Sequence, residues 1–123
     1  MRVGIVCSAV LVLLLAHAAF AQIVIDEALS IDNTSGGVSL ATATISPAGR
    51  QAVYCSAVLE TGQVRMLDNG DEPSTTVGRL VEIGDTIEIF RFTHIRAARF
   101  IRTGSTSGAA HFTCYPEYPP WVN

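Results

Sequence analysis

Two cysteines, Cys55 and Cys114, constrain this chain more than any other feature. The third cysteine of the chain, Cys7, lies in the N-terminal segment that is predicted below to be removed, so an even pair remains, which in an exported chain predicts a disulfide. Because bridged Cα atoms are usually only about 4.4–6.8 Å apart, the two segments must lie side by side or face each other across the core. A two-cysteine metal site and a pair of free thiols are the alternatives. Neither is favoured, since no further Cys or His stands at zinc-ligand spacing.

The expectation of export comes from the N-terminal segment. Arg2 precedes an apolar run over residues 3–16, and small residues, Ala19 and Ala21, stand at the positions that signal peptidase requires. The run is shorter than the roughly 20 apolar residues of a membrane-spanning helix, so a permanent anchor is the less favoured alternative. The sequence therefore predicts that residues 1–21 are a cleaved signal peptide. The remaining chain is then secreted or periplasmic, with no membrane insertion after cleavage.

Composition limits the partners of residues 22–123. With Arg2 removed, 7 arginines stand against 11 acidic residues, which gives a net charge of −4, and lysine is absent. A mildly acidic chain without a basic run is a poor candidate for nucleic-acid binding, which depends on neutralising phosphates. The length is typical of one domain.

The order of residue types predicts an all-β fold. Short segments rich in Val, Ile, Thr, Phe and Tyr alternate with clusters of Gly, Asn, Asp and Pro. About seven or eight antiparallel strands in two facing sheets are expected, in a jelly-roll or immunoglobulin-like β-sandwich over residues 22–115. The predicted strands cover residues 23–27, 38–45, 50–60, 63–67, 77–83, 86–92, 94–102 and 109–115.

Three short turn sequences join successive predicted strands. Thr61-Gly62 and Gly84-Asp85 are typical of tight turns, and Asn69-Gly70 tolerates positive φ and favours a hairpin. The sequence thus predicts that neighbouring strands along the chain also pair in space.

Residues 94–102 allow two interpretations. Arginine at every third position (Arg96, Arg99, Arg102) would line one side of a short helix. The same residues also alternate as in a strand, and tertiary context overrides propensity in short segments. The strand is preferred because it fits the surrounding pattern.

Part of the chain resembles small β-sandwich structural proteins of phage and prophage virions. The resemblance covers residues 50–115 and consists of Gln63-Val64-Arg65-Met66, Asp68-Asn69-Gly70-Asp71, Gly78-Arg79-Leu80, Ile83-Gly84-Asp85 and the segment from Ile95 to Ile101. It implies a non-catalytic structural or attachment module, and it supplies no functional residues. A signal peptide and a disulfide are both unusual for that group.

The arginines form the main basic concentration. Arg96, Arg99 and Arg102, with Arg91 before them, are candidates to grip an anionic group on a protein or glycan partner. The favoured alternative pairs them across strands with Glu82, Glu88 or Asp85, where exposed ion pairs contribute about 0–1 kcal/mol and protect sheet edges.

The C-terminal tail, residues 116–123, is rich in proline and aromatic residues. Tyr118 and Trp121 lie on a stiff, extended segment, so they are candidate partner-binding residues. The alternatives are a tail that caps the end of the domain and a partly disordered tail.

The acidic loop after residue 67 is a candidate for Ca²⁺ binding. Asp68, Asp71 and Glu72 have carboxylate oxygens that could bind the ion. Ca²⁺ is usually coordinated by about six to eight oxygen ligands. The loop lacks the Asp-x-Asp-x-Asp spacing, so a solvated turn is preferred. No other cofactor is predicted.

No constellation for nucleophilic catalysis is evident in residues 22–123. The two histidines, His94 and His111, stand in no Gly-x-Ser-x-Gly motif, and catalysis would need a base beside a nucleophile. We therefore expect a secreted, non-catalytic binding or structural module. A small secreted enzyme inhibitor, acting through residues 68–74 or the tail, or a minor secreted enzyme is the alternative. The oligomeric state stays open.

Overall fold

The computed structural model describes residues 24–122, with only the backbone at Pro47. The predicted signal peptide, residues 1–21, lies outside the described residues. Residues 24–122 form two antiparallel sheets with few helices, so the all-β prediction is confirmed.

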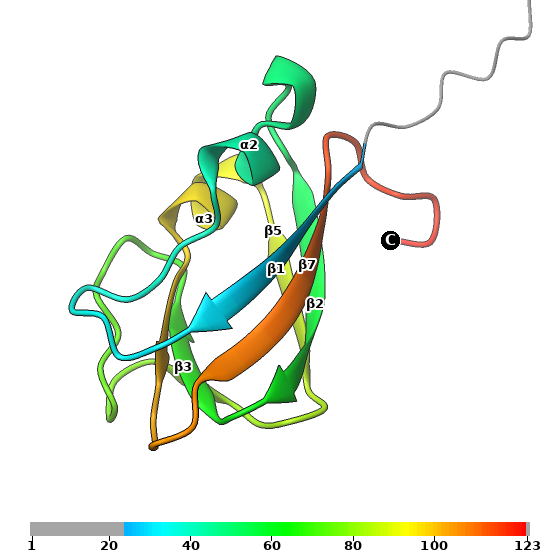
Figure 1. Cartoon of the computed structure of the whole chain (residues 1–123). Coiled ribbons are helices and arrows are strands. Elements are labelled where there is room, and N and C mark those ends of the chain that lie inside the picture. The colour runs from blue at the N-terminus through cyan, green and yellow to red at the C-terminus, as the bar shows by residue number, and fades with distance from the viewer. Residues whose placement is uncertain (1–23, 123) are drawn as a thin grey trace, which may run out of the picture.

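Sheet A has four long strands and sheet B has three short ones (Figure 1). Sheet A runs in the order β1 (Ile25–Ile31), β7 (Gly108–Tyr115), β2 (Tyr54–Thr61) and β5 (Thr86–Phe90). Sheet B runs in the order β4 (Arg79–Val81), β3 (Val64–Leu67) and β6 (Arg99–Arg102). Three helical segments lie outside the sheets: α2 (Thr42–Ile45), the 3₁₀ turn η1 (Pro47–Gly49) and α3 (Phe92–Ala97).

Both sheets contribute to one apolar core. Alternation along each strand sends every second side chain inward, as the burial of Leu59, Ile87 and Phe112 from sheet A and of Val64 and Phe100 from sheet B shows. The rings of Phe100 and Phe112 lie 5.3 Å apart between centroids and join the two sheets. Burying such side chains is the main favourable term in folding.

The predicted disulfide is present and lies in this core. Cys55 on β2 stands directly opposite Cys114 on β7, with a Cα–Cα distance of 4.2 Å, and both are fully buried. The cysteines therefore lie side by side in one sheet rather than facing each other across the core. The bridge ties an early strand to the last one.

The strand predicted over residues 38–45 is wrong. Only Val38 makes an isolated bridge, to Phe100, and α2 follows. The Glu27 carboxylate accepts a hydrogen bond from the backbone N–H of Ala41 at 3.0 Å, which satisfies a free donor at the start of this helix. Thr44 and Ile45 pack inward from it. A contact from a distant strand thus decides the local structure.

The strand predicted over residues 94–102 is half right. Residues 92–97 form α3, whereas Arg99–Arg102 form β6. Ile95 is buried, and the chain enters the helix through Arg91, a non-glycine residue with φ 69°. Packing of Ile95 against the core favours the short helix over continued strand.

Two of the three predicted turns join the two sheets, whereas the loop after β3 leads to β4, which pairs antiparallel with β3 as predicted. After Thr61-Gly62 the chain passes from β2 in sheet A to β3 in sheet B, and Glu82–Asp85 similarly separates β4 from β5. Gly62 has φ 68°, and a Cβ there would lie 2.8 Å from the Ser107 carbonyl oxygen, so this corner requires glycine. The Asn69-Gly70 pair lies in a long loop between β3 and β4 instead of a tight hairpin.

Candidate functional site

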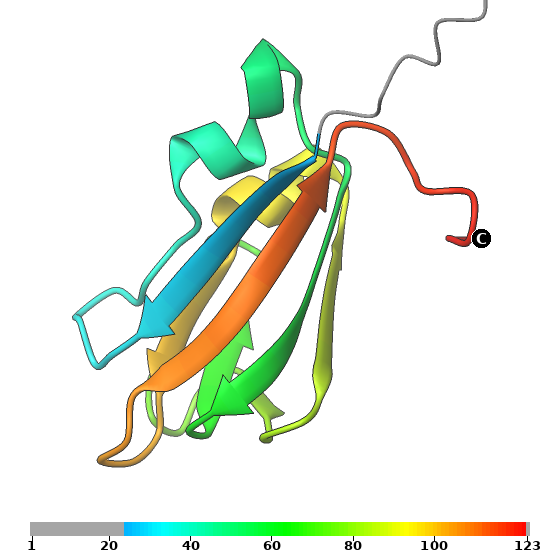
Figure 2. The same ribbon diagram turned by 45° about the vertical axis from the view of Figure 1, so that its right-hand side comes forward.

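The outer face of sheet A carries a group of aromatic and acidic side chains. On each strand the residues between the core positions point away from sheet B. Figure 2 shows the four strands as one continuous layer from which the C-terminal tail turns back. The outward residues are Asp26, Ala28 and Ser30 on β1, Tyr54, Ser56, Val58 and Glu60 on β2, Thr86, Glu88 and Phe90 on β5, and Ala109, His111, Thr113 and Tyr115 on β7.

Three aromatic side chains form a row across one end of this face, which we call the aromatic row. Strand pairing sets Phe90 and Tyr115 on either side of Tyr54. The ring of Tyr54 lies 5.2 Å from that of Phe90 and 5.8 Å from that of Tyr115, between centroids. Tyr54 is consequently only 4% exposed, whereas Phe90 is 42% exposed. Such aromatic pairs contribute about 0.5–1.5 kcal/mol beyond their burial.

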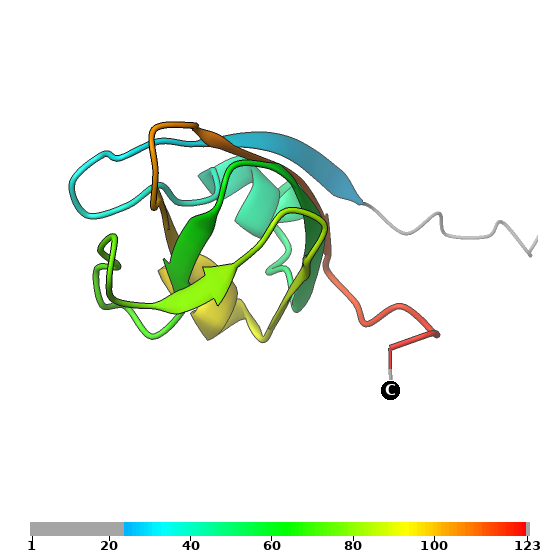
Figure 3. The same ribbon diagram turned by 90° about the horizontal axis from the view of Figure 1, so that it is seen from below.

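The C-terminal tail extends the row. The indole of Trp121 meets the ring of Tyr115 edge-on at 6.0 Å between centroids. Pro119 is fully buried and Glu117 forms an ion pair with Arg50 at 2.6 Å, so the tail is held against the rest of the molecule. Figure 3 shows it emerging beside sheet A. Trp121 nevertheless stays 66% exposed and Tyr118 50% exposed.

Two hydrogen bonds from a hydroxyl to a carboxylate also lie on this face. The Tyr54 hydroxyl donates to Glu88 at 2.8 Å, and the Thr113 hydroxyl donates to Asp26 at 2.6 Å. The pKa of the Tyr54 phenol is raised, first because the ring is buried and second because the hydroxyl donates a hydrogen bond to Glu88. The two acceptors, Glu88 and Asp26, lie at opposite edges of the sheet, because β5 and β1 are its edge strands.

The opposite end of the face is hollow. Small side chains of Ala28, Ser30 and Ala109 leave a shallow depression of about 170 Å³, and Glu60 and His111 border it. The face therefore combines raised aromatic rings at one end with a depression at the other.

Charge on this face has one sign. Its charged residues are Asp26, Glu60 and Glu88, with the exposed His111 beside them, and none of its outward positions holds an arginine. The seven arginines of the described residues lie elsewhere: Arg50, Arg65, Arg79, Arg91, Arg96, Arg99 and Arg102.

The arginines predicted to bind a partner do not form one cluster. Arg96 and Arg99 are adjacent, since an Arg99 N–H donates to the Arg96 carbonyl at 3.3 Å, but Arg102 stands at the far end of β6, where it donates to Ser105. The cross-strand ion pairs with Glu82, Glu88 or Asp85 do not form. Among residues 24–122 the ion pairs are Arg50–Glu117 and His94–Asp68.

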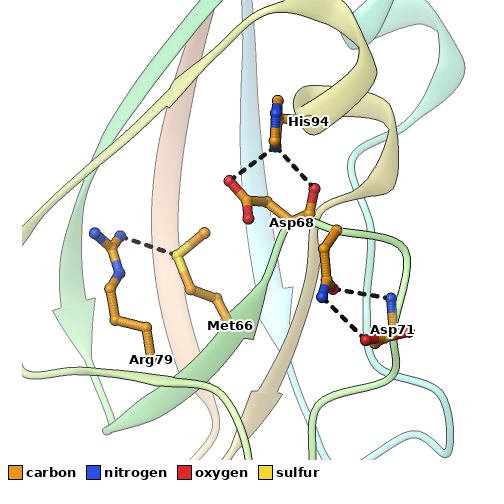
Figure 4. A network of polar contacts seen from close by, with 6 residues as sticks. Met66, Asp68, Asp71, Arg79 and His94 are labelled. Atoms are coloured by element: carbon orange, nitrogen blue, oxygen red, sulfur yellow. Dashed lines mark hydrogen bonds and ion pairs between the residues drawn. The ribbon is translucent and has the colours of Figure 1, made fainter.

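The acidic loop directs its carboxylates to separate partners (Figure 4). Asp68 lies 3.4 Å from His94 Nδ1, Asp71 accepts a hydrogen bond from the Asn69 amide at 3.0 Å, and Glu72 stands beside Gly36. Within the described part of the chain, no three His, Cys, Asp or Glu residues come together as metal ligands do. The structure thus does not assemble Asp68, Asp71 and Glu72 into the Ca²⁺ site considered above.

Sequence reasoning identified Tyr118 and Trp121 but missed the aromatic row that Trp121 contacts. The signal was present in the alternation of the strands, since Tyr54, Phe90 and Tyr115 each occupy a strand end on the side opposite the core residues. Their proximity depends on the pairing of β2 with both β5 and β7, which the sequence does not state.

Comparisons with protein-family models, curated proteins and solved structures found no match to this chain. In the part of the chain that the structure describes, no helix has the length and apolar character needed to cross a membrane.

Proposed function

We propose that this chain is a non-catalytic binding module of an extracytoplasmic surface, built as a small β-sandwich, and that it binds its partner through the outer face of sheet A. The observation that carries the proposal is the aromatic group at one end of that face, formed by the aromatic row with Trp121 against it. The partner is a protein or a glycan outside the cytoplasm, and attachment to a cell or particle surface is the corresponding role.

The distribution of exposed apolar side chains supports this choice of face. Large exposed hydrophobic residues grouped together, with polar groups around them, mark interaction sites more often than scattered ones do. Trp and Tyr are also enriched where proteins bind one another. Three of the large exposed hydrophobic residues lie on this face or contact it: Val58 and Phe90 on its strands, and Trp121 against Tyr115.

The absence of catalysis is part of the proposal. Among residues 24–122, the hydrogen bonds of the His94 ring go to Asp68 alone, and no nucleophile is placed against it. His111 is exposed on the outward side of β7 without a hydrogen-bond partner among these residues. A general base needs to lie within hydrogen-bond reach of the group it activates.

Binding to printed arrays tests the proposal. The array carries polysaccharides and peptides of acidic, neutral and basic composition, and the disulfide-intact protein is compared with the double variant Phe90→Ser and Trp121→Ser. We expect retention of the wild type on one ligand class and at least about tenfold weaker retention of the variant. The matched control is the double variant Val77→Ser and Ile83→Ser, which removes equally exposed apolar side chains from outside this face.

Two results contradict the proposal. One is equal retention of the wild type and the Phe90→Ser, Trp121→Ser variant. The other is a loss of retention in the Val77→Ser, Ile83→Ser control that matches or exceeds that of the test variant. Circular dichroism and urea unfolding of all three proteins verify that they fold alike.

A further inference from the structure

We infer that the partner held by the outer face of sheet A is a positively charged protein segment, in which Arg or Lys side chains reach the exposed rings and the carboxylates at the same time. This inference rests on the proposed function, because it names the partner chemistry of that same face.

The carboxylates of the face are placed to receive cationic groups from above. Glu88 on β5 and Asp26 on β1 lie at opposite edges of the sheet, and Glu60 borders the depression at the far end. All three residues are exposed. None of them forms an ion pair with an arginine among residues 24–122, so the negative charge of the face is not neutralised there from within the chain.

The rings favour the same partner. A guanidinium or ammonium group within about 6 Å of an aromatic ring is attracted by the negative face of that ring, most strongly for Trp. The molecule already contains this contact, since Arg96 lies 5.7 Å from the ring centroid of Phe92. The exposed indole of Trp121 and ring of Phe90 offer the same surface to a group from outside.

The width of the face favours a chain segment over a single small amine. Strands lie about 4.8 Å apart, so the carboxylates of β1 and β5 are separated by roughly 14 Å across three strand spacings. One amine cannot reach both edges, whereas successive cationic side chains of an extended segment can. The apolar floor at Ala28 and Ala109 accommodates an aliphatic side chain of the same segment.

An anionic partner fits this face poorly. Its charge would approach Asp26, Glu60 and Glu88 without a compensating arginine, and like charges brought together across an interface oppose binding. The arginines, which would attract an anion, lie outside the face.

Titration with short peptides tests the inference. Tetra-arginine, tetra-lysine and tetra-glutamate are added to the disulfide-intact protein while the fluorescence of Trp121, the chain's single tryptophan, is followed. Backbone NMR shifts locate the binding surface. We expect tetra-arginine to bind more tightly than tetra-lysine, tetra-glutamate not to bind, and the shifts to map to the outer face of sheet A, on β1, β7, β2 and β5. Affinity should fall as salt rises, because exposed charges are screened.

Matched carboxyl variants sharpen the test. Glu88→Gln keeps an acceptor for the Tyr54 hydroxyl but removes the charge, so tetra-arginine should bind about two- to fivefold more weakly, and adding Asp26→Asn should weaken it further. Glu72→Gln removes an exposed carboxylate from the loop after β3 and should leave the affinity unchanged.

Several outcomes overturn the inference. These are equal effects of Glu88→Gln and Glu72→Gln, binding of tetra-glutamate, shifts confined to sheet B, and tighter binding of a chitosan oligomer, which would identify a cationic glycan instead of a protein segment. If the peptides do not bind and array retention still depends on Phe90 and Trp121, the inference fails while the proposed function stands. If array retention is also independent of those residues, both fail.

Discussion

The two faces of sheet A differ in what their alternating residues do. On the inner face, Cys55, Leu59 and Phe112 are fully buried in the core. On β2, Tyr54, Ser56 and Val58 each lie one position away from Cys55 or Leu59 and therefore point to the outer face. They contribute an aromatic ring, a hydroxyl and an exposed apolar side chain to that face. A shift of one residue in strand register would exchange the two sets.

The difference teaches that large aromatic residues serve two purposes in this fold. Phe112 contributes to stability because its side chain is fully buried in the core, whereas part of the Phe90 ring is exposed to solvent. Changes on the inner face should therefore lower the free energy of unfolding. Changes on the outer face should leave that free energy nearly intact and alter binding.

The largest expected effect separates two phenylalanines of sheet A. Phe112→Ala leaves a cavity in the core and should lower the free energy of unfolding by about 3–5 kcal/mol. Phe90→Ala, on the opposite face, should lower it by about 1 kcal/mol through its lost contact with Tyr54. Urea unfolding followed by circular dichroism measures both. Equal losses would contradict the assignment of the two faces.

Removal of the disulfide ranks next. The pair Cys55→Ala and Cys114→Ala should lower the free energy of unfolding by about 2–4 kcal/mol, because the unfolded chain regains the freedom of a loop with a sequence separation of 59. The control pair Ser56→Ala and Thr113→Ala changes opposed residues on the outer face and should cost only about 0.5–1.5 kcal/mol, through the lost hydrogen bond from Thr113 to Asp26. The measurement is chemical denaturation, and a smaller loss for the cysteine pair than for its control would be inconsistent with the bridge.

Adjacent residues of β2 provide a finer comparison. Ala57 is 5% exposed on the inner face, so Ala57→Leu overfills the core and should cost about 1–3 kcal/mol. Val58 is 48% exposed, and Val58→Leu should change the free energy of unfolding by less than about 0.5 kcal/mol. Thermal and urea unfolding compare the two. A tolerated Ala57→Leu would indicate a loosely packed inner face.

The smallest effect concerns Tyr54 and is seen at alkaline pH. In the folded state the pKa of the Tyr54 phenol lies above its ordinary value of 10.0, mainly because the ring is buried and also because the hydroxyl donates a hydrogen bond to Glu88. The stability linked to this group is therefore fully present below pH 10 and is lost as pH rises through the folded-state pKa. Tyr54→Phe should cost about 0.5–1 kcal/mol at pH 7 and flatten the decline above pH 10. Unfolding midpoints between pH 8 and 11.5 measure this, and an unchanged alkaline decline would contradict it.

Parts of the fold were predictable from local patterns. Short segments rich in Val, Ile, Thr, Phe and Tyr between turn residues indicated strands such as β2, β5 and β7, and the pair Cys55 and Cys114 indicated the bridge. The segments 38–45 and 94–97 were predicted wrongly, because a carboxylate from β1 and the burial of Ile95 favour short helices there. Sequence patterns carry no information about such distant contacts.

The candidate site was less predictable than the fold. Tyr118 and Trp121 were identified from composition, and Arg96, Arg99 and Arg102 were grouped by their spacing. The structure separates Arg102 from the other two. It brings together Tyr54, Phe90 and Tyr115, which come from three strands far apart in the sequence.

The sequence by itself predicted strands and a bond between Cys55 and Cys114, because residue types and their order can be read without knowing which segments are in contact. Only the tertiary structure decided which strands lie side by side, and hence which rings and carboxylates share one surface. The physical reason is that strand pairing depends on burying the whole core at once, so the outer face of sheet A results from packing on its inner face.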